Sequence, residues 1–162
     1  MRAPLLLLAT LTAVSVQAPP DLSGRWAAEP AQAGDMGSGW GPAITITQDT
    51  ARLTVEYAFF GRGDMQPPLR FVYALDGSAT KNTVMMGRGV QEQTSRAAWQ
   101  GGALVITTTH GFTDPQTGKP AVVEVKRTLA LDAAGLLVVE ATRGGVLGGP
   151  PSTSRTIYKK QP

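Results

Sequence analysis

The chain contains no cysteine and only one histidine among its 162 residues. The lack of cysteine excludes a disulfide framework, a thiolate metal site and a thiol nucleophile. The single histidine, His110, has no cluster of further ligands beside it in the sequence, whereas a protein zinc site needs three or four. We therefore expect no metal site.

Charge is also scarce, at 17% of residues with a formal net charge of +3. No basic cluster is longer than Lys159-Lys160, so we expect no nucleic-acid binding. Phosphate-binding, dinucleotide-binding and serine-hydrolase motifs are missing from the sequence. Since no pair of carboxylates stands out for acid–base chemistry, the sequence assigns no catalytic residue.

The one long apolar run, Leu5 to Val16, is too short to span a bilayer. It follows Met1-Arg2 and precedes small residues, which is typical of a signal peptide over residues 1–18. Cleavage is expected after Ala18, or after Ser15, because a proline follows Ala18. We expect a monomeric protein that does not span the membrane and is exported to the bacterial periplasm or beyond.

Residues 19–162 have the length of a single domain. Apolar and polar residues alternate with a period of two, and 19 glycines and 12 prolines favour many turns. This pattern predicts an all-β protein whose candidate strands are 24–28, 43–48, 52–59, 70–75, 80–86, 91–99, 103–109, 121–131, 136–142 and 152–159.

The links between these strands alternate strictly between short and long. Successive links in an antiparallel sheet lie at opposite ends, so all tight turns fall at one end and all long loops at the other. The sequence thus predicts an antiparallel up-and-down β-barrel of 8–10 strands, with one closed end and one open end. The predicted tight turns are 49–51, 76–79, 100–102 and 132–135, and the predicted long links are 29–42, 60–69, 87–90, 111–120 and 143–151.

Gly24-Arg25-Trp26 on the first strand resembles the G-x-W signature of lipocalin-like, calycin-type barrels, as in small secreted bacterial lipocalin-like proteins. In such barrels a basic residue on the last strand packs over the tryptophan, and Arg155 is the candidate here. The usual helix after the last strand and the Thr-Asp-Tyr motif are missing. The resemblance implies that Gly24, Trp26 and Arg155 close the barrel, and that the barrel binds a small hydrophobic molecule without a cofactor.

Several residues are candidates for contact with such a ligand. Arg127 shares its alternation with inward-facing residues and could bind a carboxylate, unless a bulge turns it to solvent or its charged end extends outward. His110 lies near the open end, where Asp114 is its only neighbouring acid, and Trp40 lies in the first long loop as a lid or a loop anchor. The candidate ligand-binding residues are Trp40, Tyr57, Tyr73, Ile106, His110 and Arg127.

Three functions stay open. A binding barrel would hold a small apolar molecule in a cavity. A protein-interaction or structural barrel would have a filled core, with Trp99 among its residues, and would use its long loops as a surface. A small enzyme would use His110, with a polar partner within hydrogen-bond reach.

Overall fold

A computed structural model describes residues 18–29, 40–57, 68–86, 89–145 and 149–162, with the backbone alone at 84–86 and 89. Every regular element in this part of the chain is a β-strand, and it contains no helix long and apolar enough to cross a membrane. The ten strands are β1 (Gly24–Ala28), β2 (Ala43–Gln48), β3 (Arg52–Tyr57), β4 (Leu69–Ala74), β5 (Asp76–Met86), β6 (Gly89–Gln100), β7 (Ala103–Thr113), β8 (Pro120–Leu131), β9 (Leu137–Arg143) and β10 (Ser152–Gln161).

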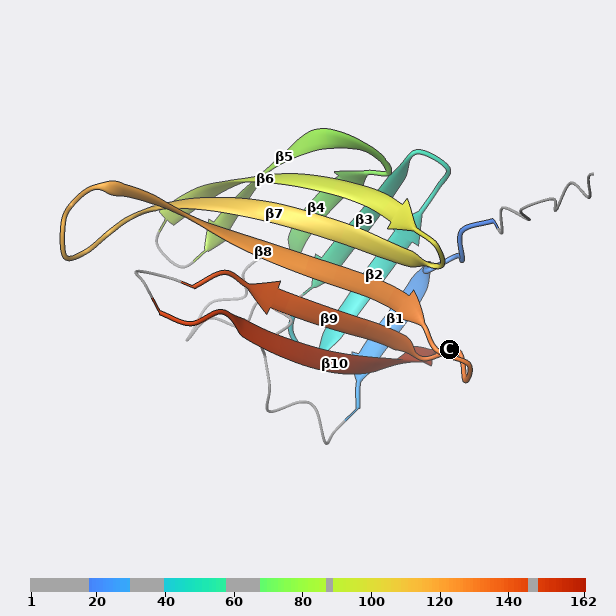
Figure 1. The fold of residues 1–162 in the computed structure, drawn as a ribbon. Coiled ribbons are helices and arrows are strands. Elements are labelled where there is room, and N and C mark those ends of the chain that lie inside the picture. The colour runs from blue at the N-terminus through green and yellow to red at the C-terminus, as the bar shows by residue number, and fades with distance from the viewer. Residues whose placement is uncertain (1–17, 30–39, 58–67, 87–88, 146–148) are drawn as a thin grey trace, which may run out of the picture.

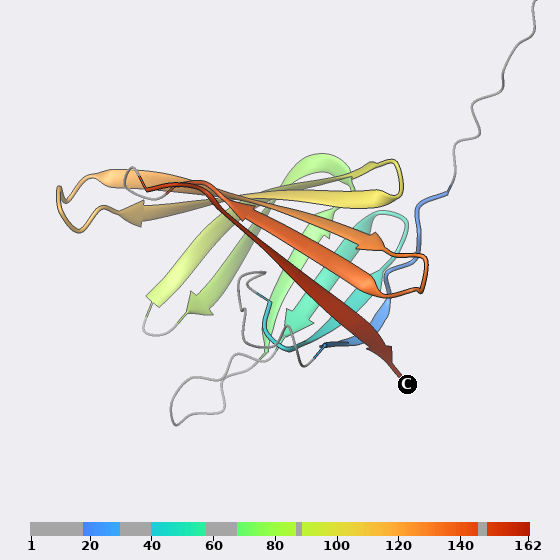
Figure 2. The same ribbon diagram turned by 60° about the horizontal axis from the view of Figure 1, so that its bottom comes forward.

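All ten strands form one antiparallel sheet in the order β4-β3-β2-β1-β10-β9-β8-β7-β6-β5. The sheet curls until its two edge strands approach, with β6 to β10 in front and β1 to β4 behind in Figure 1. Figure 2 shows the same curled sheet from below, with β10 crossing in front. The prediction of an all-β, up-and-down barrel is confirmed, with ten strands and a nearly closed wall.

The links follow the predicted order at the two ends of the barrel, with three differences in length. β5 ends at Met86 and β6 begins at Gly89, so only two residues remain of the predicted long link 87–90. β7 and β8 continue their ladder as far as Thr113 opposite Pro120, so that only a turn remains of the predicted long link 111–120. Asp114 supports that turn, because its carboxylate accepts hydrogen bonds from Gln116 N and Thr117 Oγ1. β4 and β5 are separated by Leu75 alone, and the predicted turn at 76–79 is an irregularity within β5.

The core forms because alternate residues of each strand face the barrel interior. On β3, Leu53 and Val55 are fully buried, whereas Arg52, the first residue of the strand, is exposed. The same alternation runs through β7 and β9. Fully buried large residues gather inside the barrel, and they are Leu22, Trp40, Ile46, Leu53, Val55, Tyr73, Leu104, Ile106, Leu129, Leu137, Val139 and Tyr158.

Trp26 lies where the first strand meets the last. It is 2% exposed, and its indole Nε1 donates a hydrogen bond of 3.0 Å to the carbonyl of Leu22. In the ladder Trp26 lies opposite Lys160, whose Nζ is 5.5 Å from the ring centroid. Gly24 adopts a φ of 142° beside the same lysine, a conformation that side chains other than glycine rarely adopt.

The expectation that Arg155 covers Trp26 is corrected by this register. Arg155 lies opposite Glu140 on the outer face, and its Nε is 3.6 Å from a Glu140 carboxylate oxygen. Arg155 is five residues from Lys160, an odd number, so the two side chains point to opposite faces of the strand. The basic residue over the tryptophan is therefore Lys160.

Candidate functional site

The inner face of the barrel has two unlike halves. The half made by β1 to β4 is apolar and aromatic, with the buried residues Trp26, Ile44, Ile46, Leu53, Val55, Tyr57, Leu69, Phe71 and Tyr73. The inner face of β6 to β10 instead mixes apolar side chains with polar ones. The polar members of that alternating series are Gln91, Gln93, Ser95, Thr108, His110, Arg127, Arg143, Ser152, Ser154, Thr156 and Lys160.

Arg127 lies at the centre of the polar half. Its ladder partners are Ile106 on β7 and Ala141 on β9, which are both buried inside the barrel. The guanidinium carbon lies 5.2 Å from the ring centroid of Trp40, a cation–π contact. The alternative that a bulge turns Arg127 to solvent does not fit this geometry, because β8 keeps a regular register with both neighbours.

Trp40 enters the barrel from the first long loop rather than lying over its mouth. The side chain is 1% exposed, and its ring centroid is 6.5 Å from that of Tyr73 with an interplanar angle of 46°. Trp40 also acts on the Tyr73 hydroxyl, where it opposes the rise in pKa that burial causes. The indole therefore packs between a cation on β8 and a phenol on β4, and it occupies interior volume itself.

Three tyrosines surround this pair. Tyr57 stacks on Phe71, with ring centroids 5.8 Å apart and planes 5° from parallel. The Tyr158 hydroxyl donates a hydrogen bond of 2.9 Å to the carbonyl of Gly41, which fixes the backbone next to Trp40. Tyr57, Tyr73 and Tyr158 also act electrostatically on Arg127. The structure thus brings together Trp40, Tyr57, Tyr73, Ile106 and Arg127, all named from the sequence.

Burial sets the protonation of these groups. Burial raises the pKa of Tyr73 and, less strongly, that of Tyr57, while the nearby Arg127 charge opposes both shifts. Burial lowers the pKa of Arg127, the tyrosines oppose this shift, and Arg143 adds to it. At neutral pH the tyrosines are uncharged and the guanidinium remains a cation, since arginine loses its proton only far above that pH.

His110 lies further toward the open end, opposite Val123 on β8. Burial lowers the pKa of His110, and the Arg127 and Arg143 charges lower it further. Its Nε2 is buried and has no hydrogen-bond partner among the described residues. Asp114, the candidate partner from the sequence, is half-buried and serves its own turn through Gln116 and Thr117. Within the described residues, the Asp114 carboxylate therefore does not orient His110.

Two hydroxyls on β10 belong to the site and were missed in the sequence. Thr156 is 3% exposed, and neither its Oγ1 nor the Oγ of Ser154 has a hydrogen-bond partner in the described part of the chain. The signal was their spacing, because Ser154 and Thr156 share the alternation of the buried Tyr158. By contrast, the buried hydroxyls of Ser95 and Thr108 hydrogen-bond to each other at 2.9 Å.

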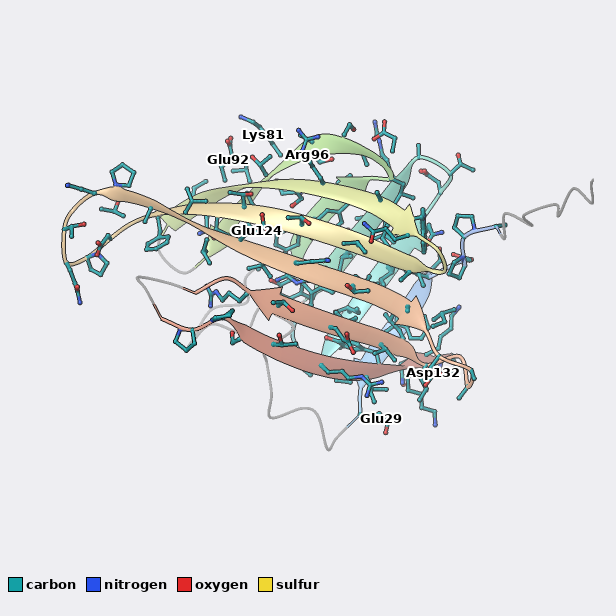
Figure 3. The ribbon with its side chains drawn as sticks, in the orientation of Figure 1. Glu29, Lys81, Glu92, Arg96, Glu124 and Asp132 are labelled. Atoms are coloured by element: carbon teal, nitrogen blue, oxygen red, sulfur yellow. The ribbon has the colours of Figure 1, made fainter. Side chains whose placement is uncertain are left out.

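Carboxylates are placed on the outside of the wall. Every glutamate on a described strand lies at an outward-facing position of that strand, and Figure 3 shows Glu92 and Glu124 on the outer surface. Glu56 pairs with Arg70 at 3.4 Å, and Glu92 pairs with Lys81 at 3.1 Å. Among the described residues no group of three or more histidine and acidic side chains is placed to hold a metal ion.

The predicted signal peptide falls almost wholly on residues 1–17, which lie outside the described residues. Trp99, the expected filler of the core, is half-buried and packs against the main cluster near the closed end. Comparison of the chain with models of known protein families, with curated proteins and with solved structures found no match.

Proposed function

We propose that this protein is a lipocalin-like barrel that binds a small, mostly apolar molecule inside its wall, through the open end. The observation that carries the proposal is the cluster of Arg127, Trp40 and the tyrosines 57, 73 and 158 within the barrel. A barrel that only needs a stable core has little reason to place a cation there, because burying a charge is costly. Apolar lining with a few polar groups is the usual composition of a small-molecule site.

Export is part of the proposal. The leader-like segment 1–18 and the absence of cysteine support a mature chain that works in the bacterial periplasm or outside the cell. The test is the intact mass of the protein recovered from the periplasmic fraction. A mass matching cleavage after Ser15 or Ala18 supports export, and retention of residues 1–18 in the cytoplasm contradicts it.

Binding is tested on the exported, full-length mature protein. Native mass spectrometry before and after exposure to mixed lipids, with titration of the neutral fluorescent probe N-phenyl-1-naphthylamine, should show saturable one-to-one uptake. Ile106→Phe, which adds volume inside the wall, should weaken uptake of the probe. Val105→Phe is the matched control, because its neighbouring position faces outward. No bound molecule and no uptake of the probe would remove the binding function.

A second candidate is a protein-interaction barrel with a filled core. The complete burial of Trp40 inside the barrel favours it, since the indole takes the place that a ligand would need. The two functions differ in the effect of Trp40→Ala. A binding barrel should take up N-phenyl-1-naphthylamine at least as well after this change, whereas a barrel with a filled core should lose stability and bind the probe in neither form.

A further inference from the structure

Two buried hydroxyls lack a use within the described fold. The Oγ1 of Thr156 and the Oγ of Ser154 are buried and have no hydrogen-bond partner among the described residues. A buried polar atom without a partner destabilises the folded state, and most such atoms in proteins are satisfied. Threonine could be replaced by valine at almost the same volume without that cost. The hydroxyls therefore point to a ligand group that accepts hydrogen bonds.

The ladder places these hydroxyls on the same inner wall as Arg127. Arg127 lies opposite Ala141, and Ala141 lies opposite Ser154, so the three form one row across β8, β9 and β10. Thr156 lies in the next row toward the closed end, opposite Val139. The residue between the cation and the serine is thus an alanine, whose methyl group is too short to separate them.

Arg127 is the cation on this inner wall, and its side chain has the chemistry that a carboxylate requires. The guanidinium carbon lies 5.2 Å from the centroid of the indole, and the five N–H groups of a guanidinium lie in one plane. Their geometry matches the two oxygens of a carboxylate, which accept two parallel hydrogen bonds. Hydroxyls that donate to the same oxygens would complete the recognition.

The charge inside the barrel favours an anion. The positive charges of Arg127 and Arg143 both lower the pKa of His110. Each glutamate on the described strands lies at an outward-facing position. Arg143 is exposed, so an anion inside the barrel interacts mainly with Arg127, where burial reduces screening by water.

We infer that the ligand is an amphiphile with a carboxylate head group, an inference that rests on the proposed binding function. The carboxylate is bound by Arg127 and by the hydroxyls of Ser154 and Thr156 on the polar half of the wall. The apolar part of the ligand contacts the opposite half, where Val55 and Phe71 are buried on β3 and β4.

The inference is tested with two probes that differ only in the head group, decanoate and 1-decanol. Binding to the mature protein at pH 8 is measured by displacement of N-phenyl-1-naphthylamine and by calorimetry. We expect decanoate to bind at least about tenfold more tightly than 1-decanol, since charge-assisted hydrogen bonds are the stronger ones. Tryptophan emission should change with decanoate, because Trp40 contacts the guanidinium.

Variants separate head-group recognition from general binding. Thr156→Val and Ser154→Ala should each weaken decanoate binding about tenfold and leave 1-decanol within about twofold. Arg127→Gln should abolish the preference for decanoate. Thr142→Val is the matched control, because Thr142 is exposed and hydrogen-bonds to Thr153 on the outer face; it should change neither affinity.

The folding of the variants also bears on the inference. Thr156→Val should keep or raise the midpoint of thermal unfolding, since it removes a hydroxyl without a partner and keeps the shape. If Arg127→Gln does not fold, the two hydroxyl variants still decide the outcome. Equal affinities for both probes, or an unchanged preference in both hydroxyl variants, would overturn the head-group assignment and leave the binding function standing. Failure of both probes to bind would remove the head-group assignment and the binding function together.

Discussion

The side-chain amide of Asn82 on β5 hydrogen-bonds to both backbone polar groups of Val72 on β4. Val72 N donates to Asn82 Oδ1 at 2.8 Å, and Asn82 Nδ2 donates to the carbonyl of Val72 at 3.0 Å. Two residues earlier, Thr80 Oγ1 accepts a hydrogen bond from Ala74 N at 3.1 Å. β4 and β5 are the edge strands of the sheet, so side chains supply along this seam what a neighbouring backbone supplies elsewhere.

Asn82→Leu should therefore destabilise the barrel. The change keeps the size of the side chain but leaves the N–H and C=O of Val72 without their partners. Asn82 is 6% exposed, so water replaces these bonds poorly, and we expect a loss of about 1–3 kcal/mol of unfolding free energy. Chemical denaturation measures the loss, with Thr83→Val, at the exposed neighbouring position, as the control. An unchanged free energy would show that the seam does not depend on this amide.

Lys160→Met should test the contact over Trp26. The methionine keeps much of the apolar stem and removes the charge 5.5 Å from the ring. We expect a loss of about 0.5–1 kcal/mol in unfolding free energy, the range for an exposed cation–π contact. Lys159→Met, which changes the adjacent outward residue, should have a smaller effect. An equal effect of the two substitutions would contradict a specific role of Lys160.

Gly24→Ala should cost more than an ordinary surface substitution. A φ of 142° is unfavourable for alanine, and an added Cβ would also meet the side chain of Lys160. We expect a loss of about 1–3 kcal/mol, the range for one strained backbone position. Gly102→Ala, at a position where a Cβ meets nothing within 4 Å, is the control for a glycine in a turn. Comparable stability of the two variants would argue against strain at Gly24.

His110 should make folding stability depend on pH near neutrality. Its folded-state pKa is lowered from 6.5 by burial and by Arg127 and Arg143. The unfolded chain then binds more protons than the folded one below about pH 6.5, so stability falls as the pH is lowered through and below that value. The aspartates with lowered pKa values, such as Asp49 and Asp114, lose their contribution only below their usual 3.8.

The window between pH 7.5 and pH 5 therefore isolates the histidine. Denaturation curves should show a falling midpoint across this window, and His110→Gln should flatten the dependence. Because the chain has one histidine, its NMR titration is read without assignment of other rings, and the midpoint should lie below 6.5. A midpoint at or above 6.5 would contradict the effect of burial.

The fold was predictable because successive side chains on a β-strand alternate between the buried face and the exposed face. The ten alternating segments predict the strands. The lengths of the links predict which links lie at the closed end of the barrel and which lie at the open end. Arg127 was also found this way, because its spacing from Val125 and Leu129 places it inside whatever its chemistry. Local patterns are sufficient for features that depend on one strand at a time.

The rest depends on contacts between strands far apart in the sequence. The choice of Lys160 over Arg155 rests on the register of β10 against β1, which no local pattern contains. Asn82 resembles a solvent-facing polar residue in the sequence, since its partner is a backbone on another strand. Ser154 and Thr156 were missed because small polar residues on a strand usually face water. The interior position of Trp40 depends on a loop whose path the sequence does not specify.

The two strands that lack a backbone ladder between them, β4 and β5, are adjacent in the sequence. Hydrogen-bonded ladders join every pair of neighbouring strands except β4 and β5, and these two are linked through the peptide chain at Leu75. β1 and β10 are joined by a ladder in which Arg25 lies opposite Gln161. A permuted chain that begins at β5, connects β10 to β1 through a short linker and ends at β4 would pair only consecutive strands. Such a chain should fold faster than the natural one, because its last long-range backbone ladder becomes a local hairpin and only the side-chain seam between β4 and β5 becomes long-range.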